Sequence, residues 1–233
     1  KSYKDLKDSD VIVFTAGRAQ LPGESRLNLV KSNMEVVKTI LPEVIKYSPD
    51  SVIIMVTNPV DILTYQASRL LKLPQGRIFG SGTSLDSARF RFHLSEFFGI
   101  NPKNIHAYVL GEHGDSSFPI AISTLQDISS EKIQEAFLKT KTAAGTIIAA
   151  KGSTYYAIGV VINQLVSAVL RDTKRVFPVS VPLTGQYGYH DVSISVPCVI
   201  GKNGVEKILE VPLSNEEKKL MDKSVKILKE III

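Results

Sequence analysis

Two short runs of apolar residues, 11–15 and 52–57, are separated by a stretch whose apolar positions recur every three or four residues. Uninterrupted apolar runs of this length are typical of strands buried on both faces of a parallel sheet. The spacing between Leu27 and Ile40 predicts a helix that joins the two strands, and we expect Pro42 to kink or divide it. Strand, helix and strand in this order predict a βαβ unit.

Helices and strands continue to alternate up to residue 110. We expect helices over residues 61–71 and 84–98, and strands over 77–79 and 105–110. Open α/β sheets bind ligands beyond the carboxyl ends of their strands, so a ligand site is expected where the segments after these strands converge. Those segments, rich in Gly, Pro, Asn or Asp, are residues 15–23, 57–61 and 80–86.

The pattern changes in the second part of the chain. Long helices are predicted over residues 130–150 and 153–170, and a last amphipathic helix over 214–232 opens on a capping box. Alternating segments 192–200 and 205–211 flank Asn203-Gly204, which is a strong hairpin signal. The fold class is therefore predicted as α/β, with a parallel part followed by an α+β part and a boundary near residue 80.

The composition limits which kinds of ligand the protein is expected to bind and in which cell compartment it is expected to work. The net charge of +5 suits a small anionic ligand, and no cluster of Lys and Arg interleaved with aromatic residues points to nucleic acid. Cys198 is the single cysteine, so no disulfide can form within the chain, which fits a reducing cytoplasm. No apolar stretch approaches the roughly 18 residues of a membrane span, and we expect a cytoplasmic protein without membrane contact.

A candidate for proton transfer is His113, which stands in Gly111-Glu112-His113-Gly114-Asp115 at the end of a predicted strand. A titratable imidazole between glycines, where a ligand can approach the backbone, suits general acid–base catalysis. The segment alone fits a solvated turn histidine equally well.

Three other charged residues each have two interpretations. Asp86 and Arg89 lie three residues apart and share one helix face, either as a simple ion pair or as a carboxylate that orients a histidine beside a guanidinium that grips a carboxylate. Arg26 follows a loop that contains Gly23, and it is either a first-turn arginine paired with Glu24 or a residue delivered by loop closure.

Six segments decide between these interpretations. They are Thr15-Ala16-Gly17, Pro22-Gly23-Glu24-Ser25-Arg26, Thr57-Asn58-Pro59-Val60-Asp61, residues 80–89, residues 111–116 and Ser153-Thr154-Tyr155-Tyr156. Together, and in this order, they resemble the lactate/malate dehydrogenase family, its L-lactate branch in particular. The resemblance implies an oxidoreductase that interconverts pyruvate and L-lactate with NAD as cofactor, on a Rossmann-type fold.

The family resemblance also implies catalytic roles. His113 would donate a proton to a 2-oxo acid, and Asp86 would hold the tautomer of the imidazole. Arg89 would clamp the substrate carboxylate with two parallel hydrogen bonds, which a lysine cannot copy. Arg26 would polarise the substrate carbonyl, and Asn58 would donate to the same oxygen.

Gln20 and Thr154 would complete the substrate pocket. Malate enzymes that share this loop carry an arginine at the position of Gln20, and a neutral glutamine leaves the second carboxylate of the malate substrate unpaired in a dry site. Pyruvate is therefore favoured. The alternative enzyme is a malate or broader 2-hydroxyacid dehydrogenase, and the alternative of another class is a catalytically silent binding or structural relative.

The matching cofactor positions are Tyr3, Thr15, Ala16, Gly17, Arg18, Val56, Thr57, Asn58, Ser81 and Ile158. The G-x-G-x-x-G fingerprint is missing, and residue 1 matches a point inside the cofactor domain of the family, so roughly 60–70 preceding residues in two βα units are expected. The fold prediction becomes an incomplete doubly wound sheet in residues 1–80 and a catalytic domain in 81–233. About a dozen family residues are missing near 122–126, by the length of a loop plus helix.

A longer enzyme and a truncated relative both fit this departure from the family. We favour the longer enzyme, because the loss of half a parallel sheet would expose a long apolar edge.

Arg91 and His106 match the pair that binds fructose 1,6-bisphosphate in allosteric bacterial members of the family. The resemblance therefore implies activation by this bisphosphate, with a surface arginine and a strand histidine as the alternative. It further implies a homotetramer, and no metal site is expected.

Overall fold

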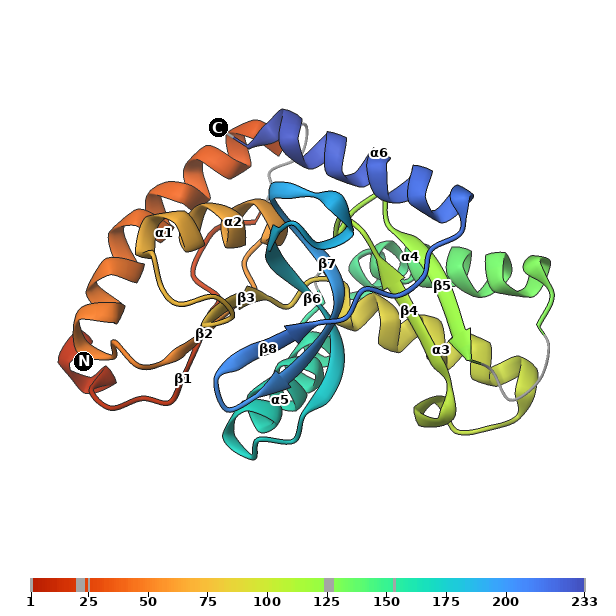
Figure 1. Cartoon of the computed structure of the whole chain (residues 1–233), viewed down its shortest axis with the longest axis horizontal. Coiled ribbons are helices and arrows are strands. Elements are labelled where there is room, and N and C mark those ends of the chain that lie inside the picture. Colours follow the sequence, from red (N-terminus) through yellow and green to blue (C-terminus); the bar gives the residue numbers. More distant parts are fainter. Residues whose placement is uncertain (1, 20–23, 25, 124–127, 153, 233) are drawn as a thin grey trace.

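The structure is a computed structural model that describes residues 2–19, 24, 26–123, 128–152 and 154–232. One six-stranded mixed sheet has the order β1-β2-β3-β6-β7-β8, and β4 and β5 form a separate antiparallel pair (Figure 1). The strands are β1 (Val11–Phe14), β2 (Val52–Met55), β3 (Ile78–Gly80), β4 (His106–Leu110), β5 (Phe118–Ser123), β6 (Arg175–Thr184), β7 (His190–Gly201) and β8 (Gly204–Ile208).

Helices cover the sheet on both faces and pack around the β4–β5 pair (Figure 1). The α-helices are α1 (Arg26–Tyr47), α2 (Val60–Leu71), α3 (Ser84–Phe98), α4 (Ser130–Lys151), α5 (Tyr156–Leu170) and α6 (Asn215–Ile231). Three short 3₁₀ turns are η1 (Tyr3–Leu6), η2 (Pro102–Asn104) and η3 (Gln186–Gly188).

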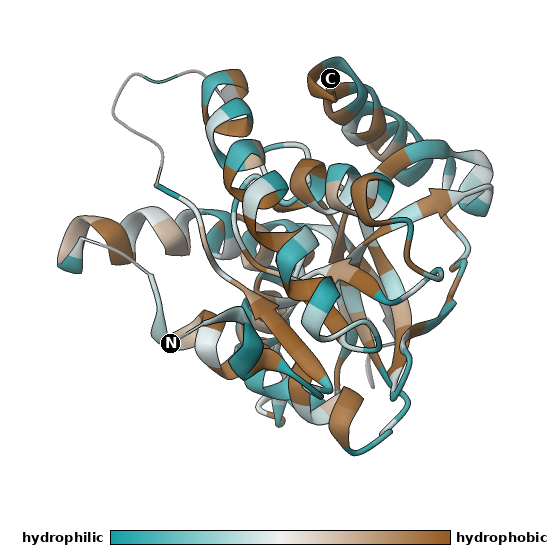
Figure 2. Ribbon diagram, turned by 90° about the vertical axis from the view of Figure 1, so that its left-hand side faces the viewer, coloured by the Kyte–Doolittle hydropathy of each residue, from teal (hydrophilic) through white to brown (hydrophobic). Residues whose placement is uncertain are grey.

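The first three strands are parallel, as the apolar runs predict. All four residues of β2 are buried, and they alternate between two cores. Ile53 and Met55 pack on the face covered by α1 and α2, whereas Val52 and Ile54 pack in the core that contains α5. Figure 2 shows the apolar residues concentrated in the strands at the centre of the molecule.

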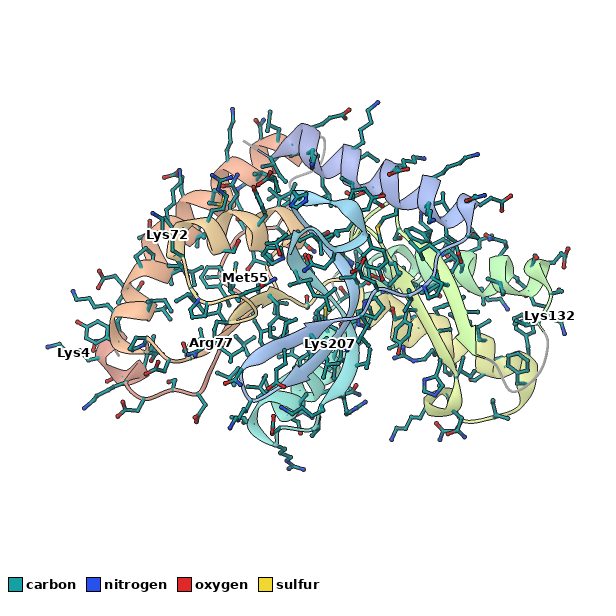
Figure 3. All side chains as sticks on the ribbon, in the orientation of Figure 1. Lys4, Met55, Lys72, Arg77, Lys132 and Lys207 are labelled. Carbon is teal, nitrogen blue, oxygen red and sulfur yellow. The ribbon has the colours of Figure 1, made fainter. Side chains whose placement is uncertain are left out.

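The periphery is polar and charged. Figure 3 places Met55 among the side chains of the interior, whereas Lys4 and Lys132 project from opposite margins of the molecule.

The second part of the chain adds antiparallel strands to the same sheet. Gly80 of β3 pairs with Ser180 of β6, and the β7–β8 hairpin closes between Gly201 and Gly204, where the Asn203-Gly204 signal predicts it. The predicted α/β class with its parallel sheet and later α+β part is confirmed by this architecture. The sheet crosses residue 80 without a break, and the boundary placed there stays a prediction.

Some elements differ from the sequence-based expectation. Pro42 does not divide the first helix, because α1 runs unbroken from Arg26 to Tyr47. Pro42 and Lys38, whose carbonyl loses its helical partner, are both exposed, so water can satisfy that carbonyl. Strands β5 and β6 were not predicted, and the last strand ends at Ile208 rather than residue 211.

None of the described helices is long and apolar enough to cross a lipid bilayer. The described residues hold no group of three or more His, Cys, Asp or Glu placed to bind a metal ion. Cys198 is a free thiol buried in the core, and its burial raises its pKa. The deficit expected near 122–126 falls largely on residues 124–127, outside the described part of the chain.

Candidate active site

The loop that carries His113 leaves the end of β4 and is held by hydrogen bonds to three other elements. Gly111 exchanges two backbone hydrogen bonds of 3.1 Å with Ser195 of β7. Gly111 has φ +94°, and a Cβ there would lie 2.6 Å from the Oγ of Ser224 on α6. Glycine is therefore required at this position by both conformation and space.

The imidazole of His113 is paired with a carboxylate. Nδ1 of His113 lies 2.8 Å from Oδ2 of Asp86, which stands in the first turn of α3. Burial alone would raise the pKa of Asp86, but the hydrogen bond and charge of His113, with Arg89, outweigh it and hold that pKa below its usual range. An ionised Asp86 thus fixes the ring and favours its protonated form.

Arg89 follows one helical turn later on the same face of α3. Its Nη1 lies 3.9 Å from Oδ1 of Asp86. Its Nη2 is buried and has no hydrogen-bond partner among the described residues. Arg89 lines a pocket of about 340 Å³ together with Thr154 and the aromatic rings of Tyr155 and Tyr156. The structure therefore brings the two predicted substrate residues Arg89 and Thr154 into one pocket.

The segments that follow β1 and β2 are joined by Asn33, which sequence reasoning missed. Asn33 is fully buried in α1; its Oδ1 accepts the N–H of Arg18 at 2.9 Å, and its Nδ2 donates to the carbonyl oxygen of Asn58 at 2.7 Å. Thr57 Oγ1 donates to the carbonyl oxygen of Ala16 at 2.8 Å. The exposed Asn58 is thereby set beside the β1 loop.

Some predicted residues near this loop are engaged elsewhere or not described. The guanidinium of Arg18 makes a bidentate ion pair with Glu24 and donates to Ser32 at 2.9 Å. Gln20 lies outside the described residues. Arg26 is the first residue of α1, but its side chain also lies outside what the structure describes.

Most predicted cofactor positions converge at the carboxyl ends of the parallel strands. Thr15, Ala16 and Gly17 follow β1, Val56 and Thr57 follow β2, and Ser81 follows β3. Ile158 of α5 packs against the same core as Val56.

Tyr3 is the exception. It lies in η1 before β1, at the opposite end of the strand, where the carbonyl of Leu6 accepts a hydrogen bond from Ser48. The structure does not bring Tyr3 to the crevice.

The predicted allosteric residues lie on α3 and β4, which pack together. Arg91 donates to the carbonyl oxygen of Ala107 at 3.1 Å, and His106 is exposed at the start of β4. Burial and the nearby charge of Arg175 lower the pKa of Arg91. Arg175 is thus a third basic group of this region, which the sequence analysis did not identify.

Asp61 is a second residue whose contact with the site the sequence analysis missed. It is 3% exposed, and its Oδ2 accepts the backbone N–H of His113 at 2.7 Å. Burial raises the pKa of Asp61 to about 6, with the nearby Ser180 and the backbone hydrogen bond from His113 opposing the shift. The sequence around Asp61 does not indicate a contact with His113, which lies 52 positions away along the chain.

Two family models cover nearly the whole chain. The lactate/malate dehydrogenase NAD-binding domain matches residues 1–80, and the lactate/malate dehydrogenase alpha/beta C-terminal domain matches residues 83–233. The fold and the histidine–carboxylate–arginine site agree with an oxidoreductase of this type, and the chain belongs to the lactate/malate dehydrogenase family. The resemblance inferred from the sequence motifs and the prediction of NAD as cofactor are confirmed.

Individual relatives narrow the comparison. The chain is 45% identical to an L-lactate dehydrogenase of Thermoanaerobacterium saccharolyticum over 244 residues, covering 99% of this chain and 78% of the relative. A lactate dehydrogenase structure from a Medee basin deep-sea metagenome library superposes with TM-score 0.92 at 36% identity, covering 100% of this chain and 78% of that one. Malate dehydrogenase of Cryptosporidium parvum gives TM-score 0.90 at 34% identity, covering 99% of this chain and 78% of that one.

Proposed function

We propose that the chain interconverts pyruvate and L-lactate with NAD, using His113, Asp86 and Arg89 as the central residues of the site. The NAD-dependent L-lactate dehydrogenase activity has the support of the family models and of curated relatives at 45% identity. The observation that carries the residue assignment is local. A carboxylate-bound imidazole lies on the same side of α3 as a buried guanidinium nitrogen without a hydrogen-bond partner among the described residues.

His113 acts as the acid in pyruvate reduction and as the base in lactate oxidation. Because Asp86 occupies Nδ1, Nε2 is the nitrogen that meets the substrate oxygen. A protonated Nε2 donates its proton to the oxygen as negative charge develops there, and the ionised Asp86 stabilises the imidazolium before transfer. In the reverse direction the neutral ring accepts the hydroxyl proton.

Arg89 binds the carboxylate that pyruvate and lactate share. A guanidinium with an unpartnered buried nitrogen gains most from a bidentate carboxylate, because the ligand removes the cost of leaving that donor unsatisfied. Thr154 and the nearby aromatic rings form part of the wall of the same pocket.

The residues at the strand ends fit the nicotinamide end of the cofactor. Val56 and Ile158 present apolar surface from one core, and Thr15 and Ser81 add hydroxyl groups at the carboxyl ends of β1 and β3. Residues 15–17, 56–58 and 81 carry no carboxylate that would repel a phosphate. When bound, NADH would supply the hydride, and these residues would hold its nicotinamide end.

Specificity for pyruvate is assigned to Gln20, with Arg26 and Asn58 at the substrate carbonyl. The malate alternative remains relevant because structural neighbours include malate dehydrogenases at 34% and 35% identity. The test compares kcat/KM for pyruvate and oxaloacetate in the natural chain and in Gln20→Arg. We expect pyruvate to be preferred and the substitution to raise relative activity on oxaloacetate at least tenfold, since it pairs an otherwise unpaired carboxylate. Preference of the natural chain for oxaloacetate contradicts the assignment.

His113 is tested by His113→Gln, which keeps a polar side chain without a transferable proton. We expect kcat to fall by at least about 100-fold while NADH affinity changes little. Binding of NADH to the natural protein, measured by fluorescence titration, also separates an active enzyme from a silent relative. Normal turnover by His113→Gln removes His113 from the mechanism.

A second proposal concerns regulation by fructose 1,6-bisphosphate. Arg91, His106 and Arg175 supply basic groups in one region, and desolvation of Arg91 makes an anion at this place favourable. We expect the bisphosphate to raise activity at low pyruvate and Arg91→Gln with His106→Gln to abolish the response. Unchanged activity with added bisphosphate refutes the proposal.

We further infer a homotetramer in the cytoplasm, as the family resemblance implies. Light scattering of the purified protein measures the assembly, and a monomeric mass at micromolar concentration contradicts it.

A further inference from the structure

Asp61 is a buried carboxyl group that the mechanism above does not use. It stands in the first turn of α2 and is 3% exposed. Its Oδ2 accepts the backbone N–H of His113 at 2.7 Å. A charged side chain in this position is costly to bury, so its direct bond to the proposed proton donor requires a physical account.

The bond is one of three successive anchors on the His113 loop. The amide of Gly111 donates to the carbonyl oxygen of Ser195 at 3.1 Å, and the amide of Glu112 donates to Ser224 Oγ at 3.2 Å. The amide of His113 then donates to Asp61. These partners belong to β7, α6 and α2 respectively. Among the three, Asp61 alone is a carboxylate, and it alone holds the catalytic residue itself.

We propose that Asp61 is a positioning residue for the proton-transfer step and acts by fixing the backbone of His113. The inference rests on the role assigned to His113 above. Asp86 fixes the far side of the imidazole through Nδ1. It does not fix the backbone from which the ring extends, and Asp61 supplies this second point of attachment.

The attachment also couples two groups that face the same substrate oxygen. Asn58 lies in the turn after β2, and Asp61 lies three residues later in the first turn of α2; Oδ1 of Asn58 accepts the N–H of Val60 at 3.3 Å. A hydrogen bond from His113 to this segment therefore sets the distance between the histidine and Asn58. Errors of about 1 Å in such a distance reduce rates by about 100-fold.

The groups around Asp61 come from several elements. Thr64 lies on α2, Ser180 on β6, and Glu112 and His113 on the loop after β4. His113 lowers the pKa of Asp61, whereas Glu112 and burial raise it. The space is closed on the β3 side, where a Cβ on Gly80 would lie 2.5 Å from Thr64 Oγ1 and 3.0 Å from Ser180 Cβ. Thr64 and Ser180 therefore leave no space for a larger residue than glycine at position 80.

Two substitutions separate the hydrogen bond from folding. Asp61→Ala removes the acceptor, whereas Asp61→Asn keeps an amide oxygen that accepts the same N–H more weakly. In steady-state assays with pyruvate and NADH, we expect kcat to fall about 100-fold in Asp61→Ala and about tenfold in Asp61→Asn. KM for pyruvate should stay within about threefold, because the proposed carboxylate ligand Arg89 lies on α3 beside Asp86, whereas Asp61 lies on α2.

The pH profile gives a readout that a structural role alone does not move. A nearby negative charge favours the imidazolium form. In both variants, the alkaline limb of the kcat/KM profile for pyruvate should therefore shift to lower pH. The matched control is Ser51→Ala at the amino end of β2. Ser51 is also fully buried, and its Oγ donates to the carbonyl oxygen of Ser48 at 2.9 Å. Its kinetics should match the natural chain.

Three outcomes separate the proposals. The inference is overturned if soluble, folded Asp61→Ala or Asp61→Asn keeps kcat within twofold of Ser51→Ala. It is also overturned if the loss appears in KM alone with an unchanged pH profile. If Asp61→Ala does not fold, Asp61→Asn decides by the same criteria. Full activity in His113→Gln refutes the underlying role of His113 instead, whatever the Asp61 variants do.

Discussion

Two carboxyl groups contact His113, and their pKa values are shifted in opposite directions. Asp86 accepts a hydrogen bond from Nδ1 of His113 and has a pKa below its usual range, whereas burial raises the pKa of Asp61 to about 6. Asp86 therefore stabilises the folded chain above its unfolded-state pKa, and this contribution is lost as the pH falls through its folded-state value. Asp61 has the opposite effect: its contribution to stability is present at low pH and is lost as the pH rises through its folded-state pKa.

Removing the charge of Asp86 should impair proton transfer directly. We expect Asp86→Asn to lower kcat for pyruvate about 100-fold, because the imidazolium loses its counter-charge and the tautomer is no longer fixed. The alkaline side of the kcat/KM profile should move to lower pH. Asp115→Asn, the same change at an exposed position of the same loop, is the control and should have little effect. Equal kinetics of the two variants would exclude a role for Asp86.

The raised pKa of Asp61 makes a prediction about stability. Between the unfolded-state pKa near 3.8 and the folded-state value of about 6, the folded chain binds more protons, so stability falls as pH rises through this window. At pH 7 the ionised group costs about 3 kcal/mol relative to its protonated form. Asp61→Asn should gain stability relative to the natural chain between pH 4 and pH 7, measured by urea unfolding. A stability difference independent of pH would contradict the shift.

At the scale of elements, the His113 loop depends on close contact between Gly111 and α6. Gly111→Ala combines a positive φ with a Cβ 2.6 Å from Ser224 Oγ. Gly152→Ala has φ +83° and nothing within 4 Å, so it measures the conformational cost alone. We expect about 1 kcal/mol for Gly152→Ala and about 1–3 kcal/mol more for Gly111→Ala, by thermal or urea unfolding. Adding Ser224→Ala to Gly111→Ala should restore part of the extra loss in the free energy of unfolding. Equal losses for Gly111→Ala and Gly152→Ala would show that the contact with Ser224 adds no steric cost.

The elements were predicted best where packing and periodicity agree. The parallel strands β1 and β2 were identified from their apolar runs, and the β7–β8 hairpin from Asn203-Gly204. Strand β6 was missed because Pro178 and Pro182 interrupt its sequence. Its single bridge to β3 is at Ser180, so neither proline has to donate in that pairing.

The site residues that were predicted stand in local sequence motifs, whereas those that were missed act through contacts with residues far away in the sequence. His113, Asp86 and Arg89 were found because each stands in a recognisable motif. Asn33 and Asp61 were missed because their importance lies in contacts 25 and 52 residues away along the chain. An asparagine inside a helix and an aspartate in a first turn look ordinary until the fold brings their partners to them.

At the scale of the whole molecule, one sheet and one core cross the boundary predicted near residue 80. The largest core cluster contains Val52 of β2, Leu165 of α5 and Met221 of α6. We therefore expect a single cooperative unfolding transition, with coincident urea curves from far-UV circular dichroism and tyrosine fluorescence. The sequence has no tryptophan, so tyrosine is the available probe. Two separated transitions would show that residues 1–80 and 81–233 unfold independently.

The placement of the proposed residues has a consequence for how such an enzyme diversifies. His113, Asp86 and Arg89 all lie in the segment matched by the C-terminal family model, whereas Gln20 lies in the segment matched by the NAD-binding model. The residue proposed to discriminate substrates is therefore remote in sequence from those proposed to move the proton and to bind the shared carboxylate. If Gln20 has this role, substitutions near residue 20 can alter the accepted 2-oxo acid without changing His113, Asp86 or Arg89.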